Sequence, residues 1–204
     1  MKLDLSVQRH AGYALLAAAL FGASTPAAKL LLAHASPLVL AGLLYPGSGL
    51  GLALVRTARR AFGRATARAP LHRALRGRQW LSLSGAVASG GVLAPVLLLW
   101  GLSGTAASST SLLLNLEGVA TMIVAALVFR ESVSARIWLS AALMFVGASL
   151  LSYAPGARFG FSLHGLAVIG ACIAWAFDNN LTRAISTQDP FAIAMIKGVV
   201  AGTT

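Results

Sequence analysis

The segment TAASSTSLLLNLEGVATMIVAALVFRES, residues 105 to 132, decides the class of protein because it places a carboxylate inside a run suited to lipid. From Ala106 to Phe129 the only charged side chain is Glu117. A helix of that length crosses a hydrocarbon core of roughly 30 Å, so Glu117 is expected near the bilayer midplane. An acid there costs on the order of 2.5 to 3.5 kcal/mol and should face a helix bundle or an aqueous cavity. Glu117 is therefore a candidate functional residue.

The composition indicates an integral membrane protein. The chain of 204 residues is 57% hydrophobic and only 10% charged, whereas soluble domains carry about 25% charged residues. The net charge of +11 raises the alternative of nucleic-acid binding, but that function needs a basic face on a folded soluble module. Half of the basic residues instead lie in an acid-free linker, residues 56–78, between two apolar runs. This is the pattern of a positive-inside loop that can contact anionic lipid headgroups.

Seven apolar segments follow one another along the chain. A signal peptide is the alternative interpretation of the first, but its apolar run resumes after the small residues at 22–24 and further spans follow at once. In the second, Gly47 and Gly51 lie four apart, a spacing that lets another helix approach closely. The predicted segments are residues 11–33, 38–55, 80–100, 106–129, 137–153 and 163–182, and a seventh that begins near residue 191.

The distribution of basic residues predicts the orientation of these segments. If the segments alternate in direction, one side of the membrane receives nearly all the loop charges, namely Lys2, Arg9, the linker arginines, Arg130, Arg136 and Arg183. The other side receives Arg158, while Lys29 and Lys197 lie inside apolar segments. The positive-inside rule therefore predicts a cytoplasmic amino terminus.

A weak repeat relates the start of the chain to its end. The aligned pairs are Phe21-Gly22 with Trp175-Ala176 and Lys29 with Arg183 at a separation of 154 residues, then Pro37 with Pro190 and Gly49 with Gly202 at one residue fewer. Five spans separate the copies, and this odd number makes the second copy run through the membrane in the opposite direction. Inverted repeats of this kind are found in many secondary transporters.

The second copy of the repeat is unfinished. From residue 191 to 204 the chain offers roughly 21 Å of helix, which is short of the hydrocarbon core. We expect one five-span unit over residues 1–153, the start of a second over residues 163–204, and three further spans, ten in all, in a complete molecule. The predicted fold class is an all-α membrane bundle of inverted five-span repeats.

The region from residue 106 to 152 resembles the EamA-type branch of the drug/metabolite transporter superfamily. The resemblance is carried by AASSTS at 106–111, the leucine run into Glu117, FRES at 129–132 and the helix that contains Gly147. Glu131 is similar to a recurrent glutamate of the family. Many members have tryptophan where this chain has Phe21 and proline where it has Gly118. The resemblance therefore does not identify the substrate. It implies secondary transport of small metabolites or drug-like solutes across the bacterial inner membrane by alternating access.

The fourth segment carries two polar stripes, because residues three or four apart share a helix face. Thr110, Glu117 and Thr121 form one stripe, and Asn115 belongs to the other. We expect one stripe to face a cavity and the other a neighbouring helix. Glu117 is expected to bind substrate or to couple transport to protons, and the alternative is a structural bond between helices.

Three adjacent polar residues, Asp178, Asn179 and Asn180, lie near the cytoplasmic end of the sixth segment. Successive helical residues turn by about 100°, so the three cannot all face one way. They are candidates for the substrate path, and the alternative is a polar helix end that reaches interfacial water.

Two lysines lie within apolar segments. Lys197 is a candidate partner for Asp178 or Glu117, and Lys29 lies near the outer end of the first segment. Either side chain could instead extend to the membrane interface. Glu131 is interpreted as a structural charge at a helix end, stabilising the following helix through its dipole.

The sequence shows no Ser/His/Asp arrangement, phosphate-binding loop or zinc signature, so we expect no enzyme, no cofactor and no metal site. The single cysteine, Cys172, excludes an intramolecular disulfide. Two alternatives to transport stay open: a non-transporting membrane scaffold or sensor component, and an inactive fragment. The solute is an unidentified small molecule, and the oligomeric state is open, with a homo-oligomer as one option.

Overall fold

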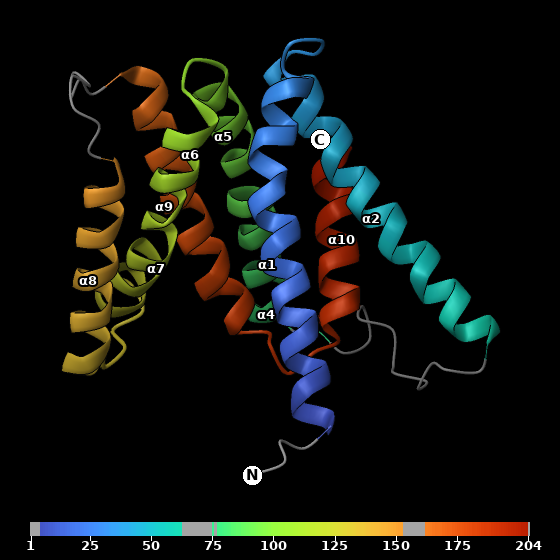
Figure 1. Cartoon of the computed structure of the whole chain (residues 1–204). Helices are drawn as coiled ribbons and strands as arrows, with labels where there is room; N and C mark the ends of the chain where they lie inside the picture. Colours follow the sequence, from blue (N-terminus) through green and yellow to red (C-terminus); the bar gives the residue numbers. More distant parts are fainter. Residues whose placement is uncertain (1–4, 63–74, 76, 153–161, 204) are drawn as a thin grey trace.

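The computed structural model describes residues 5–62, 75, 77–152 and 162–203, and this part of the chain folds into helices without a strand (Figure 1). The all-α prediction is confirmed for these residues. The elements are α1 (Leu5–Leu31), α2 (Pro37–Ala61), α4 (Arg78–Ala86), the π-helix η1 (Val87–Leu93), α5 (Ala94–Ser103), α6 (Ala107–Leu114), α7 (Leu116–Leu127), α8 (Ala135–Ser152), α9 (Leu163–Arg183) and α10 (Pro190–Gly202).

Four stretches of helix are long and apolar enough to cross a membrane. They are Ala11–Leu31, Pro37–Ala61, Arg78–Ser103 and Ala107–Leu127, and they agree with the first four predicted segments. Two further apolar helical stretches, Ala135–Gly147 and Pro190–Gly202, are shorter. The helix α2 continues through Arg56, Arg59 and Arg60, so the described start of the basic linker is helical.

The helices α2 and α10 begin in the same way. Before α2 the side chain of Ser36 accepts a hydrogen bond from the first turn, and before α10 the side chain of Asp189 does so. Pro37 and Pro190 then occupy the first helical positions, where the missing N–H costs nothing. The predicted alignment of Pro37 with Pro190 therefore corresponds to a shared local structure.

The link after α7 is fixed by a left-handed residue. Arg130 has a φ of 54°, and the N–H of Glu131 donates to the carbonyl of Ala125 at 3.0 Å. The left-handed conformation after a helix end is usually adopted by glycine, because a Cβ disfavours it. The turn brings Glu131 alongside the end of α9, where it forms an ion pair with Arg183.

The core of the bundle is built around α9. This helix packs against α4, η1, α5, α6 and α7, and its buried positions are small residues such as Ala167, Ala171 and Ala176. Small side chains let helix backbones approach closely where lipid gives no hydrophobic drive for association. The polar residues of α9 are thereby held against helices from the earlier part of the chain.

The helices α2 and α10 run in opposite directions and cross at glycines (Figure 1). A Cβ added to Gly49 would lie 2.7 Å from the backbone nitrogen of Val199, and one added to Gly198 would lie 2.7 Å from the nitrogen of Gly49. The prediction that Gly47 and Gly51 provide the close approach is wrong, because a Cβ at either would meet nothing within 4 Å. The contact uses the opposite side of the helix.

The outer faces of the bundle are apolar. Exposed leucines include Leu15 and Leu20 on α1, Leu43 on α2 and Leu139 on α8. A water-soluble monomer rarely exposes so much contiguous apolar surface. These faces suit contact with lipid.

Candidate functional site

An ion pair buried between α9 and α10 forms the centre of the site. The ammonium of Lys197 donates to both carboxylate oxygens of Asp178, at 2.5 and 2.6 Å. The hydroxyl of Thr182, one turn along α9, donates to the same carboxylate at 3.0 Å. Asp178 is 5% exposed, and a buried acid needs such partners because desolvation of a charge is costly. Of the two acids considered as partners of Lys197, the structure selects Asp178.

The π-helix η1 presents a backbone carbonyl to this region. The hydroxyl of Tyr45 on α2 donates to the carbonyl of Gly90 at 2.6 Å, and the indole N–H of Trp175 on α9 donates to it at 3.2 Å. π-Helical turns alter the regular backbone ladder and occur frequently at functional sites. A Cβ at Gly90 would overlap the side chain of Asp178. The acid therefore occupies the space that this glycine leaves free.

A second polar cluster joins α7 to α9. The side-chain amide of Asn179 donates to Glu117 at 3.0 Å and to the hydroxyl of Thr121 at 3.2 Å. The amide of Asn180 donates to the backbone carbonyls of Thr121 and Ala176. Glu117 and Thr121 thus share the face of α7 that meets α9, as the helical spacing predicted.

The three adjacent polar residues of α9 separate, as their 100° rotation requires. Asp178 points to Lys197, while Asn179 and Asn180 bond to α7. Asn115 is not part of either cluster: it is exposed, and its amide donates to the carbonyls of Ser111 and Leu112 in its own helix.

Lys29 lies away from both clusters. Its ammonium donates to the carbonyls of Leu102 at 2.6 Å and Ser103 at 3.1 Å, at the end of α5. A cation at a helix carboxyl end satisfies carbonyls that have no partner within the helix. Lys29 therefore fastens the end of α1 to the end of α5.

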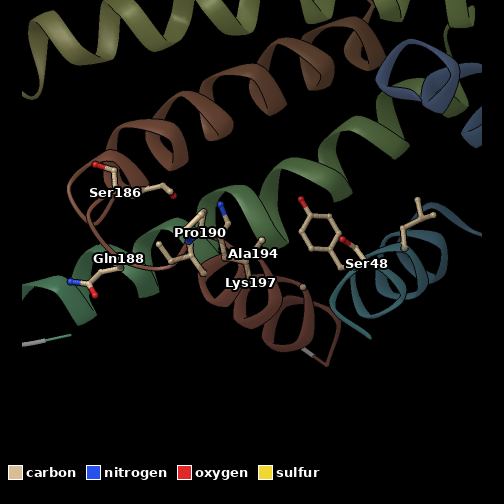
Figure 2. A pocket seen from close by; sticks show the side chains of 11 residues that line it. Ser48, Ser186, Gln188, Pro190, Ala194 and Lys197 are labelled. Carbon is tan, nitrogen blue, oxygen red and sulfur yellow. The ribbon is translucent and has the colours of Figure 1, made fainter. Parts of the chain in front are cut away.

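A cavity of about 480 Å³ opens between α2, α10 and the loop that joins α9 to α10. Figure 2 shows the side chains that line it, with Ser48 on α2, Ser186 and Gln188 on the loop, and Lys197 on α10 between them. Thr182 and Tyr45 complete its polar lining. The cavity thus leads from the loop to the lysine of the buried ion pair.

A second cavity of about 260 Å³ lies between α1, α2, α5 and α9. Its lining is almost entirely apolar and includes Leu98, Leu99 and Trp175. Leu44 and Tyr45 line both cavities. The ring of Tyr45, held by its bond to Gly90, therefore stands between the cavity that Lys197 lines and a smaller, almost entirely apolar one.

Two ion pairs hold the ends of α9 and α10. Arg56 on α2 lies 3.4 Å from Asp189, which caps α10, and Arg183 pairs with Glu131 after α7. The guanidinium of Arg59 lies 5.2 Å from the centre of the Phe191 ring. The interpretation of Glu131 as a structural charge agrees with its ion pair, although its partner is Arg183 and not the dipole of the following helix.

Sequence reasoning missed Tyr45, Ser48 and Gly90. A tyrosine or serine in an apolar span is common and carries no spacing signal. Gly90 and Gly91 stand side by side in the third span, but adjacency alone does not predict a π-helix. Only the packing of α9 against η1 shows why the first of them matters.

Comparison with known proteins places these features in a family. The profile of the EamA-like transporter family matches residues 9–153. An uncharacterized transporter from Methanothermobacter thermautotrophicus is 32% identical over 118 residues, which are 54% of this chain and 34% of the relative. The chain thus matches about a third of that relative's length. No solved structure matches.

The family profile covers the chain from within α1 through α8, and the apolar helices agree with a protein that crosses the membrane several times. It also covers Glu117 and Thr121, whereas Asp178 and Lys197 lie beyond the matched residues. The chain is a multi-pass membrane protein that belongs to the EamA-like transporter family.

Proposed function

We propose that the protein is a secondary transporter that moves a small metabolite or drug-like solute across the bacterial inner membrane by alternating access. The observation that carries this proposal is the 480 Å³ cavity that leads to the buried pair of Asp178 and Lys197. Charges inside an apolar bundle are costly and mark solute or ion paths in membrane proteins. A scaffold has no need of a cavity that reaches such a pair.

The solute path that we propose follows the polar side chains of α9 and α10. Lys197 and Thr182 line the cavity, and Asp178 stands directly behind them. Asn179 and Asn180 connect this region to α7, where Glu117 and Thr121 lie. Asn115 and Lys29, which were candidates from sequence, are assigned to the helix ends.

Glu117 is the residue that we propose for proton coupling. It is half-buried, and its carboxylate accepts its hydrogen bond from the neutral amide of Asn179. Asp178, in contrast, is neutralised by Lys197. A carboxylate without a bonded cation can be protonated without leaving a cation unpaired inside the bundle. We therefore assign proton coupling to Glu117 and not to Asp178.

An inverted repeat is proposed for the architecture, and the crossing of α2 and α10 supports it. A Cβ at Gly49 would meet Val199, and a Cβ at Gly202 would meet Pro46. In the predicted alignment, which shifts residue numbers by 153, Gly49 corresponds to Gly202 and Pro46 corresponds to Val199. The two contacts are therefore equivalent positions in the two repeats, as a two-fold axis between repeats requires. Such an arrangement predicts ten spans in the complete protein.

The experiment is a flux assay in proteoliposomes that contain the complete protein, across a panel of amino acids and small drugs and over a range of pH. We expect proton-driven flux of at least one compound, and we expect Glu117→Gln to abolish its dependence on pH. Glu131→Gln is the matched control, because it removes an acid at a helix end, and its flux should keep the same pH profile.

Two outcomes would contradict the proposal. Absence of flux for every compound, with folded protein in the membrane, would favour the scaffold or sensor function. Flux with an unchanged pH profile in Glu117→Gln would remove Glu117 from the coupling mechanism.

A further inference from the structure

The cavity between α2 and α10 is asymmetric in charge. Among the described residues that line it, Lys197 alone is charged, and the other polar groups are Tyr45, Ser48, Thr182, Ser186 and Gln188. Its acidic partner, Asp178, lies behind Lys197 and does not line the cavity. Among the described residues, the lining of the cavity therefore offers a solute one cation and neutral hydrogen-bonding groups, and no carboxylate.

The hydrogen bonds between Asp178 and Lys197 add to this difference in charge between the lining of the cavity and the residues behind it. The two oxygens of Asp178 accept from Lys197, and one of them also accepts from Thr182. A lysine ammonium has three donors, and two of them serve Asp178. Among the described residues the ammonium of Lys197 has no partner besides Asp178, so its third donor is available to a solute. A cationic group of a solute, in contrast, would have to displace Lys197 to reach the acid.

We propose that this cavity binds its solute through a single carboxylate, with Lys197 as the charged partner and neighbouring hydroxyl and amide groups as neutral partners. The inference rests on the proposed function and names its class of solute. A phosphate is less suited, because doubly charged phosphates are usually held by bidentate arginines or by several cations, and only one cation lines this wall.

The second cavity indicates the size and polarity of the rest of the solute. It is apolar, has a volume of about 260 Å³ and shares Leu44 and Tyr45 with the cavity that Lys197 lines. A carboxylate with a compact apolar body could therefore keep its charge at Lys197 and direct its body towards Tyr45. Asp178 would compete with this carboxylate for the ammonium of Lys197.

The test uses three probes of nearly equal shape: benzoate, benzylammonium and benzyl alcohol. Their binding to the purified complete protein in lipid nanodiscs is measured by isothermal titration calorimetry. We expect benzoate to bind and the cationic and neutral probes to bind at least about tenfold more weakly, which corresponds to about 1.4 kcal/mol. Asp178→Asn removes the competing carboxylate and should tighten benzoate binding.

The double variant Asp178→Asn/Lys197→Gln removes both charges, so it leaves no unpaired ion buried, and it should lose benzoate binding. Lys29→Gln, a lysine outside the cavity, should bind benzoate as the wild type does. The inference is overturned if benzylammonium binds as tightly as benzoate, if benzoate fails to bind at tens of millimolar, or if the double variant retains it.

Failure of this inference can be told apart from failure of the proposed function. Flux of a cationic solute that is independent of Lys197 would overturn the carboxylate site and leave transport standing. Benzoate binding without flux of any compound, in contrast, would support the site and contradict transport.

Discussion

Gly90 contributes to the site because it has no side chain and so leaves room for Asp178. Its backbone lies so close to Asp178 that a methyl group would occupy the place of the carboxylate, while its carbonyl accepts from Tyr45 and Trp175. One residue therefore joins η1, α2 and α9. Replacement of this glycine should disturb both the ion pair and the two hydrogen bonds.

We expect Gly90→Ala to destabilise the protein by about 1 to 3 kcal/mol, the usual cost of overpacking. The measurement is the melting temperature of the purified protein in detergent. Gly42→Ala is the control, because a Cβ at Gly42 would meet nothing within 4 Å. Equal melting temperatures for the two variants would contradict the packing of Asp178 against η1.

Among the described residues, Arg130 is the one residue other than glycine with a positive φ. Its φ of 54° is costly for any residue with a Cβ. We expect Arg130→Gly to stabilise the protein by up to about 1 kcal/mol, while Arg130→Ala, which keeps a Cβ, gives no gain. Chemical denaturation followed by tryptophan fluorescence would measure both. A loss of stability in Arg130→Gly would contradict a strained left-handed turn after α7.

At the scale of elements, the crossing of α2 and α10 forms one wall of the cavity that Lys197 lines. The two helices touch through Gly49 and Gly198, where a Cβ on either would clash with backbone atoms of the other. Backbone cannot move aside as a flexible side chain can. The position of Lys197 relative to Ser48 therefore depends on these two glycines.

We expect Gly198→Ala to reduce the free energy of unfolding by about 1 to 3 kcal/mol. The melting temperature should fall accordingly. Gly51→Ala should be neutral or slightly stabilising, because Gly51 lies on the open side of α2 and alanine is the better helix former. If both variants melted alike, the close contact between α2 and α10 would be wrong.

The sequence predicted the helices better than it predicted their contacts. Hydrophobic length and basic loops located the spans, and the spacing of Glu117 and Thr121 placed both on one face of α7. The same reasoning chose Gly47 and Gly51 as the contact of α2, and the structure uses Gly49. A shift of two positions rotates a helix by about 200°. A pattern within one helix does not state which side its partner occupies.

The arrangement of the site could not be predicted without the fold. Lys197 was predicted to pair with Asp178 or Glu117, and only the packing of α10 against η1 and α2 decides between the two acids. Tyr45 and Gly90 had no signal in the sequence, because their role comes from the approach of helices that are far apart in the chain. Glu117 could be identified because an acid is rare in an apolar span.

At the scale of the whole molecule, orientation can be tested apart from transport. Arg59 lies in the last turn of α2 and Ser103 at the end of α5, which Figure 1 shows at opposite ends of the bundle. In a Cys172→Ala background, intact spheroplasts are treated with a membrane-impermeant maleimide. We expect Ser103→Cys to react and Arg59→Cys to be protected, because basic loops stay in the cytoplasm. The reverse pattern would contradict a cytoplasmic amino terminus.

The most direct test of the central claim is to block the cavity during transport. In the Cys172→Ala background, flux of a transported compound is measured in Ser48→Cys before and after a thiol reagent attaches a bulky group through a disulfide. Gly51→Cys, on the open side of the same helix, is the control. The account predicts that modification stops flux only in Ser48→Cys and that reduction restores it. Undiminished flux through fully modified Ser48→Cys would show that the solute does not pass through this cavity.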